Sequence, residues 1–424
     1  MGKGRSMRTC PRCGEQSEAR WFCPRCGASL PDDMASVRRK RSRLKRRLGL
    51  ILAGISAVLM TLCVIVLVVA SVPDPVALVL SVAAAVVPAV GYAWLIVRLD
   101  RYEVEPRRAL IGAFAWGAVG AVLFSIVAEV LFAGLLAISV GPSAADVLTI
   151  TVGAPAIEEA FKGGALLALL WFFRREFDNV LDGLVYGALI GLGFAMTENI
   201  LYFGAAYLED GPRGLGELFV ARAVLDGLGH AQYTGTTGAA VGWARSRYGR
   251  GLGQYLMPML GYGLAVFQHV LWNTGTVVIA GLHGEDLSVI TLVLVMVPFF
   301  TLPAVVVLYL IARAASRREL QILQATLRDE VVRGLLTPEE YQVLTTERLR
   351  KRALAAARQR GGKPLQQRVQ RFFQVAAELA FRTYHLRRGE RPKPGQHAPE
   401  ERYREEIVAL RTQLAAAGLH LGVA

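Results

Sequence analysis

The sequence predicts an all-α polytopic membrane protein with about eight transmembrane helices, a small N-terminal zinc ribbon and a helical cytosolic tail. Of its 424 residues, 53% are hydrophobic and only 19% are charged. Most of the middle is a series of apolar segments of roughly 20 residues or more, the length that a helix needs to cross a bilayer. The polar ends carry a repeated cysteine motif and helix-forming basic segments, respectively.

The charge of the chain is concentrated at its two ends. Residues 1–47 hold 14 Lys and Arg against 4 Asp and Glu, and residues 313–424 hold 22 against 12. Each end therefore carries +10, whereas the middle, with 12 against 18, carries −6. Basic ends beside an apolar body predict contact with an anionic lipid surface rather than with nucleic acid.

Residues 1–30 are expected to form a zinc ribbon. Cys10 and Cys13 lie in a Cys-Pro-Arg-Cys-Gly motif, and Cys23 and Cys26 lie in a second copy of it. Four thiolates from two such turns make a closed tetrahedral zinc site. A pair of disulfides is the alternative, and it requires an oxidising compartment. We therefore expect a structural zinc ion on which this small segment depends to fold.

A basic linker at residues 31–47 precedes the first apolar segment. Eight of the ten residues 38–47 are Lys or Arg. Such a run can bind nucleic acid, but directly before a hydrophobic helix it is typical of a cytoplasmic flank. The N-terminal end is therefore expected on the cytoplasmic side.

Residues 48–312 are expected to form the eight-span domain. Loops rich in arginine at 98–108, 174–175, 245–250 and 313–318 alternate with loops poor in Lys and Arg. This alternation predicts a multi-pass protein of the cell membrane with both termini in the cytoplasm. The expected spans are 48–70, 76–97, 109–137, 147–173, 180–208, 217–244, 252–281 and 287–312.

The tail, residues 313–424, is too polar to enter the membrane and is expected to be helical. Thr337 with Glu340 forms a capping box around Pro338, which predicts a helix start. Residues 361–362, both glycine, should break a basic helix, and a final amphipathic helix is expected at about 399–417. The tail could contact the membrane surface, a second copy or an unknown cytosolic partner. The ribbon could also bind an unknown cytosolic partner.

The fourth expected span contains two adjacent carboxylates, Glu158 and Glu159. Ionisable groups in a membrane-length apolar segment are costly and usually mark a functional site. Lys162 lies one helical turn further, within reach of Glu158 or Glu159. It should neutralise one carboxylate and leave the other available. A structural ion pair is the alternative.

Four consecutive expected spans carry ionisable residues at a similar depth. Glu158, Glu198, His230 and His269 each lie roughly 10–13 residues from the outer end of their spans, which at about 1.5 Å per residue gives depths of roughly 15–20 Å. Neighbouring spans run in opposite directions, so no sequence period produces this agreement. A shared site near the membrane midplane is therefore expected.

Residues one helical turn away could support this site. Asp226 precedes His230 by four residues and could orient its ring, and Arg222 could pair with Asp226. His269 and Asn273 share one helix face.

Glutamate and histidine beside water can activate that water, by general-base catalysis or through a bound metal. In a metal-free site, a histidine and an asparagine could stabilise the oxyanion. An ion or proton transporter would use similar residues, and a non-catalytic scaffold or sensor is a further alternative.

In combination, these motifs resemble the PrsW-type intramembrane proteases, which are related to the CAAX-protease and bacteriocin-processing group. The resemblance covers roughly residues 90–312. It rests on the motifs Glu158-Glu159-x-x-Lys162, Phe194-x-x-x-Glu198-Asn199, His230 in a glycine-rich helix, and His269-x-x-Trp272-Asn273.

The resemblance implies a bacterial membrane enzyme that cleaves membrane-anchored proteins, including anti-sigma factors in stress signalling. It implies Glu158 or Glu159 as the base, with Glu198, His230 and His269 as metal ligands or water-positioning groups. The family is described as metalloproteases, whereas some members of the wider clan use a metal-free glutamate mechanism. That clan often has Arg in place of Lys162 and His in place of Glu198, so the need for a metal stays open. The ribbon and the tail lie outside the resemblance.

Overall fold

A computed structural model describes the helical body of the chain and two short strands. The described residues are 8–9, 16–17, 33–100, 102, 105–172, 177–247, 251–283, 288–389 and 399–421. The chain divides into two compact units, Met1–Cys63 and Val64–Ala424.

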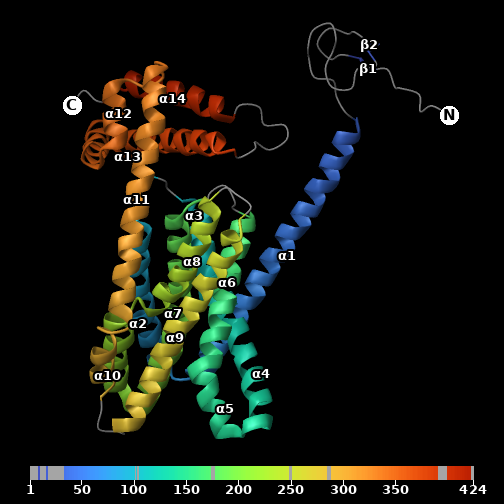
Figure 1. Cartoon of the computed structure of the whole chain (residues 1–424), viewed down its shortest axis with the longest axis vertical. Helices are drawn as coiled ribbons and strands as arrows, with labels where there is room; N and C mark the ends of the chain where they lie inside the picture. The colour runs from blue at the N-terminus through green and yellow to red at the C-terminus, as the bar shows by residue number, and fades with distance from the viewer. Residues whose placement is uncertain are drawn as a thin grey trace, which may run out of the picture. The chain divides into compact units, whose positions relative to one another are not determined.

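The described residues are almost entirely helical (Figure 1). The α-helices are α1 (Asp33–Ser71), α2 (Pro75–Val97), α3 (Arg107–Ala115), α4 (Val122–Val140), α5 (Pro142–Leu148), α6 (Ala154–Phe172), α7 (Val180–Phe219), α8 (Gly229–Ser246), α9 (Gly253–His283), α10 (Val289–Met296), α11 (Thr301–Val332), α12 (Pro338–Thr345), α13 (Glu347–Arg387) and α14 (Pro399–Ala416). Wider π-helical turns, η1 (Trp116–Ala121), η2 (Thr149–Gly153) and η3 (Val220–Leu225), interrupt three of the longer helical runs.

The N-terminal unit contains a short hairpin. Strands β1 (Arg8–Thr9) and β2 (Gln16–Ser17) pair antiparallel, with Thr9 opposite Gln16. The segment between them includes the first cysteine motif. The cysteines themselves lie outside the described residues, so the zinc ribbon stays a prediction: Cys10, Cys13, Cys23 and Cys26.

Among the described residues, five helical segments are long and apolar enough to cross a membrane, or six if a bent pair counts as one span. The expected eight spans are therefore not confirmed. The segments are Ile51–Ser71, Pro75–Val97, Arg107–Val140, Val180–Ser246 and Gly253–Leu282, with Val289–Met296 and Thr301–Val332 as the pair bent by 46°.

Two of the expected spans fall within one of these segments. Val180–Ser246 is 67 residues long, about three times what one crossing needs. Its backbone leaves the helical conformation at Asp210 and at Gly211, where φ is +59°. It is interrupted again between η3 and α8. The expected spans 180–208 and 217–244 therefore correspond to α7 before its kink and to a broken helix after it.

The expected fourth span corresponds to α5, η2 and α6, which follow one another without a gap. Glu158, Glu159 and Lys162 place three charged residues within the 19 residues of α6. Their cost inside a membrane is reduced because they contact one another.

The centre of the helical body is the pairing of α7 with α8, where glycines allow the two backbones to touch. A Cβ atom on Gly191 would lie 2.1 Å from the carbonyl oxygen of His230, and one on Gly238 would lie 1.9 Å from that of Gly183. Close contact of this kind is typical of small residues between membrane helices. It brings the middle of α7 against the first turn of α8.

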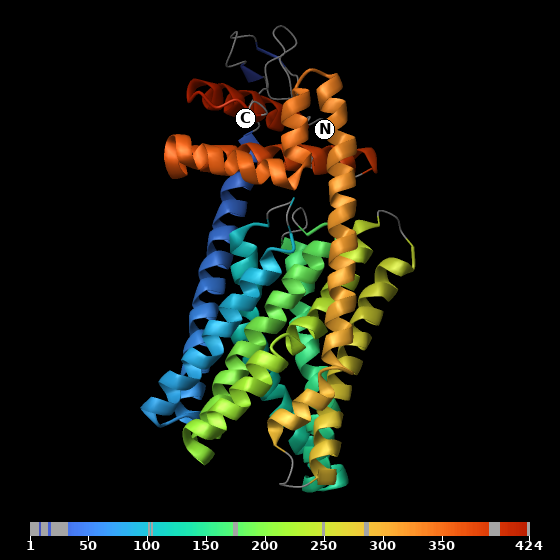
Figure 2. The same ribbon diagram turned by 90° about the vertical axis from the view of Figure 1, so that its left-hand side faces the viewer.

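The C-terminal helices form a second apolar core, and α11 connects them to the transmembrane helices (Figure 2). Thr337 caps α12, accepting from the Glu340 backbone at 3.1 Å, and the Glu340 side chain accepts from the Thr337 backbone at 3.0 Å. The expected capping box is confirmed. So is the break at Gly361 and Gly362, where φ at the second glycine is +66°.

Candidate active site

Three consecutive ionisable side chains of α6 form a buried charge cluster. Lys162 Nζ donates to Glu158 Oε2 at 2.8 Å and to Glu159 Oε1 at 2.9 Å. Lys162 and Glu159 are fully buried, and Glu158 is 5% exposed. The helical spacing of three and four residues permits both contacts at once. The expectation that Lys162 pairs with only one carboxylate is therefore wrong, because its ammonium reaches both.

Lys162 also connects α6 to α8. Its Nζ lies 3.0 Å from His230 Nδ1, and His230 Nε2 lies 3.0 Å from Glu198 Oε2 on α7. An ammonium has no lone pair, so Nδ1 must accept and the proton of a neutral imidazole is on Nε2. His230 then donates that proton toward Glu198. The charge of Lys162 thus fixes the tautomer of His230.

His230 lies in the first turn of α8, directly after an interruption of the helix. The interruption includes Asp226, whose Oδ1 accepts from the hydroxyl of Thr301 at 2.6 Å. Thr301 is itself the first residue of α11, after the bend that follows α10. Irregular backbone at membrane depth is tolerated where it lines a cavity or is buried in protein. Asp226 does not orient His230 as expected, because both ring nitrogens of His230 have other partners.

Glu198 is paired with Arg222 rather than left free. Arg222 Nη2 donates to Glu198 Oε2 at 2.5 Å, and its Nε donates to Asn199 Oδ1 at 2.7 Å. The expected pairing of Arg222 with Asp226 is replaced by these two contacts. Glu198 therefore forms an ion pair with Arg222 and accepts a hydrogen bond from the ring of His230.

His269 on α9 completes the group. Its ring lies 5.0 Å from that of His230, centroid to centroid, and stacks on Tyr233 at 4.7 Å. His269 Nδ1 is buried 3.5 Å from Glu159 Oε1, without a hydrogen-bond partner among the described residues. Asn273, one turn further along α9, donates its amide to the carbonyl of Ile150 at 2.9 Å.

These residues surround a polar cavity of about 190 Å³. Glu158 lines it, whereas Glu159 does not. Both oxygens of Glu159 are engaged, one by Lys162 and the other by Thr234 at 2.9 Å. The cavity is lined by Glu129, Thr149, Ile150, Ala154, Glu158, Glu198, Tyr202, Arg222, Asp226, His230, Tyr233, His269, Trp272 and Asn273. All the expected site residues except Glu159 therefore face one space.

Two functional candidates were missed in the sequence. Tyr233 and Thr234 follow His230 by three and four residues, so they share its helix face, which is the signal that could have identified them. Tyr233 lines the cavity, and its hydroxyl is buried without a hydrogen-bond partner among the described residues. Phe194 packs beneath Lys162, whose Nζ lies 3.7 Å from the ring centroid, as in a cation–π contact.

The cluster is also a possible metal-binding group. Glu158, Glu159, His230 and His269 each offer a ligand atom within 4.8 Å of all the others. Two carboxylates and two imidazoles suit zinc by residue type. In the observed arrangement, however, Lys162 is hydrogen-bonded to three of these four residues. A metal ion and the ammonium would compete for the same lone pairs, so metal binding requires Lys162 to withdraw.

Comparison with known proteins shows that the region holding this cluster is similar to a recognised sequence family. Residues 105–303 match the PrsW family of intramembrane metalloproteases. The chain is also 31% identical over 173 residues to the protein named Protease PrsW of Geobacillus kaustophilus; the matched region is 39% of this chain and 66% of the relative, just under two thirds. No solved structure matches the chain. Both comparisons concern the part of the chain that holds the polar cluster, which is similar in sequence to PrsW-family intramembrane metalloproteases.

Proposed function

We propose that the protein is an intramembrane endopeptidase that hydrolyses a peptide bond of a membrane-anchored protein. The observation that carries this proposal is the cavity beside Glu158, which is lined by several carboxylates, two imidazoles and Tyr233 inside apolar helices. A cavity of about 190 Å³ is large enough to hold several water molecules. Hydrolysis within the membrane requires such water.

Glu158 is the proposed general base. It faces the cavity, and its hydrogen bond to Lys162 uses only Oε2. Glu158 takes a proton from water as the water oxygen attacks the substrate carbonyl carbon, and it later returns a proton to the leaving amine. Glu159 is proposed as a positioning residue, because it is enclosed and holds Lys162 and Thr234.

Tyr233 is proposed to stabilise the oxyanion that forms on the substrate. The Tyr233 hydroxyl lines the cavity without a described hydrogen-bond partner, so it is available to donate. His230 already donates its Nε2 proton to Glu198 and accepts from Lys162, so it is proposed as a positioning residue that holds these two side chains in place. Donors fixed in a water-poor site stabilise developing charge strongly. Asn273 is proposed to support the cavity wall through Ile150.

A metal-assisted version rests on the same residues. Glu158, Glu159, His230 and His269 would hold the ion, with Glu198 behind His230. A zinc ion would supply Lewis-acid polarisation of the carbonyl and a more acidic water. Because Lys162 already provides a positive charge at this place, we propose that the chain's own residues suffice.

We further propose a setting for this reaction. Substrates are membrane-anchored regulatory proteins such as anti-sigma factors, both termini of the protease are cytoplasmic, and the basic ends contact anionic lipid. The N-terminal cysteines hold a structural zinc ion, and the ribbon and tail bind a cytosolic partner.

The proposal is tested by the release of a fragment from a single-span reporter protein in liposomes that contain the purified protein. Glu158→Gln should abolish release while the protein is produced and folded normally. A transporter would instead show ion or proton flux that Glu158→Gln stops, without cleavage. A scaffold would tolerate the substitution in both assays.

A further inference from the structure

A second group of carboxylates lies outside the candidate active site. Asp100 and Glu105 lie in the segment that precedes α3, and Asp182 lies in the first turn of α7. Each offers a carboxylate oxygen within 4.8 Å of the other two. Glu105 is 4% exposed and Asp182 is 1% exposed.

Within the described ranges, Glu105 and Asp182 each have one carboxylate oxygen that accepts hydrogen bonds and one that does not. Glu105 Oε2 accepts from the hydroxyl of Tyr186, and Asp182 Oδ2 accepts from the backbone of Asp178 at 2.8 Å and of Asn179 at 3.0 Å. These donors are neutral. Glu105 Oε1 and Asp182 Oδ1 are buried and have no hydrogen-bond partner among the described residues.

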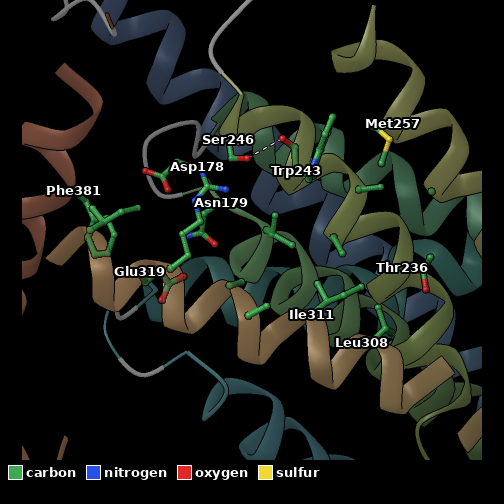
Figure 3. Close-up of a pocket in the computed structure, with 18 of the residues that line it drawn as sticks. Asp178, Asn179, Thr236, Trp243, Ser246, Met257, Leu308, Ile311, Glu319 and Phe381 are labelled. Atoms are coloured by element: carbon green, nitrogen blue, oxygen red, sulfur yellow. Dashed lines mark hydrogen bonds between the residues drawn. The ribbon is translucent and has the colours of Figure 1, made fainter. Parts of the chain in front are cut away.

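A further carboxylate, Glu319 on α11, interacts electrostatically with the same group. Glu319 is 3% exposed, and neither of its oxygens has a hydrogen-bond partner in the described part of the chain. The charges that it meets are those of Asp100, Asp182 and Asp178. Glu319 and Asp178 line one pocket, whose walls come mainly from α8, α9, α11 and α13 (Figure 3). Asp178 pairs with His385 of α13, whose Nε2 lies 2.7 Å away.

Buried carboxylates this close together need compensating positive charge. Burial, followed by the charges of Asp182 and Asp100, raises the pKa of Glu105 well above its ordinary value. Arg350 supplies positive charge near Asp100, but the buried oxygens Glu105 Oε1 and Asp182 Oδ1 still require a proton or a cation. Clustered carboxylate oxygens with unused lone pairs are the ligands that hard divalent cations prefer. For Ca²⁺, ligand distances of about 2.3–2.6 Å place two coordinating oxygens at most about 5.2 Å apart, which is compatible with oxygens that all lie within 4.8 Å of one another.

We propose that Asp100, Glu105 and Asp182 bind one hard divalent cation, Ca²⁺ or Mg²⁺, and that Glu319 is a fourth carboxylate of the same site. The cation would join the segment before α3, the first turn of α7 and α11. Because α11 continues into the C-terminal helices, the bound ion would fasten these helices to the transmembrane helices. This site is separate from the cavity beside Glu158 and does not depend on the proposed protease activity.

The test is equilibrium binding of Ca²⁺ alone and of Mg²⁺ alone to the purified full-length protein in detergent at neutral pH. Thiolates are poor ligands for these hard ions, so the N-terminal cysteines should not bind them. We expect one saturable ion per chain. Asp182→Asn and Glu105→Gln should each weaken binding about tenfold or more, because each removes one charged ligand.

Two control variants separate this site from other carboxylates. Asp329→Asn removes a carboxylate from α11 whose partner is the exposed Arg387, and Glu158→Gln alters the candidate active site. Both should bind the ion as the wild type does. Binding that is absent in wild type, unchanged in Asp182→Asn, or lost in Glu158→Gln would overturn the proposal.

Thermal unfolding guards against a variant that merely misfolds. Without added ions, Glu319→Gln should unfold no earlier than the wild type, because the substitution relieves repulsion among carboxylates. With saturating ion, the wild type should gain more in Tm than Glu319→Gln, since ligands that bind only the folded state stabilise it. Equal gains in the two proteins would contradict a role for Glu319.

Discussion

The ammonium of Lys162 lies 3.0 Å from Nδ1 of His230 while it also holds Glu158 and Glu159. A single buried cation therefore balances two carboxylates and sets the tautomer of a histidine on another helix. The arrangement has the form expected of a preorganised site, because Lys162 is fully buried and its ammonium faces the ring of Phe194.

Lys162 tests this arrangement most selectively. In Lys162→Met no cation remains to balance the two buried carboxylates, so cleavage of the single-span reporter should fall about 100-fold or more. Lys162→Arg keeps the charge and should retain a substantial part of the activity. Initial rates of fragment release, normalised to folded protein, give the comparison. Equal losses in both variants would show that size rather than charge matters at this position.

Tyr233 is predicted to contribute a hydrogen bond to the reaction. Tyr233→Phe removes only the hydroxyl and keeps the stacking on His269, so kcat should fall about 100-fold with little change in KM. Tyr262→Phe is a suitable control, because that hydroxyl donates to the carbonyl of Ala156 and does not line the cavity. A Tyr233→Phe enzyme with unchanged kcat would remove Tyr233 from the mechanism.

Gly191 is predicted to be essential for the contact between α7 and α8. A Cβ at this position would lie 2.1 Å from the carbonyl oxygen of His230, so Gly191→Ala should destabilise the protein by about 1–3 kcal/mol and displace the first turn of α8. Gly164→Ala, where nothing lies within 4 Å of the added atom, is the matched control. In detergent, Gly191→Ala should denature more easily than Gly164→Ala, and it should cleave the reporter more slowly. Equal stability and equal cleavage rates would argue against close packing at Gly191.

Removal of metal ions is predicted to leave cleavage largely intact, because Lys162 already engages three of the four possible ligands. A chain shortened to begin at Met34 avoids interference from the N-terminal cysteines. Its cleavage rate should stay within about twofold after chelation, which is a difference of about 0.4 kcal/mol. Loss of activity that added zinc restores would instead establish a metal-assisted reaction.

Much of this site could be predicted from the sequence, because ionisable residues are rare in apolar membrane segments. Charged residues in apolar segments stand out, and the agreement in depth of Glu158, Glu198, His230 and His269 indicated a common site. The structure places Glu158 3.9 Å and Glu198 3.0 Å from the His230 ring nitrogens. Capping at Thr337 and the break at Gly361–Gly362 were also predictable, since both depend on local backbone chemistry.

The remaining features depend on contacts between distant segments. The pairing of Arg222 with Glu198 instead of Asp226 is decided by how α7 meets η3, and the bond from Thr301 to Asp226 joins two broken helices. Hydropathy alone could not place these breaks, because apolar composition continues through them. It also gave no signal for Glu319, which is 219 residues after Asp100 in the chain and meets it only in the folded protein.

The central claim, that Glu158 is the base of a peptidase inside the membrane, is tested most directly by cleavage of a single-span reporter with purified protein. Wild type, Glu158→Gln and the control Glu217→Gln, which alters an exposed pair with Arg213, are compared at equal amounts of folded protein. The account predicts fragment release by wild type and Glu217→Gln and none above background by Glu158→Gln. Release by Glu158→Gln at the wild-type rate would contradict it.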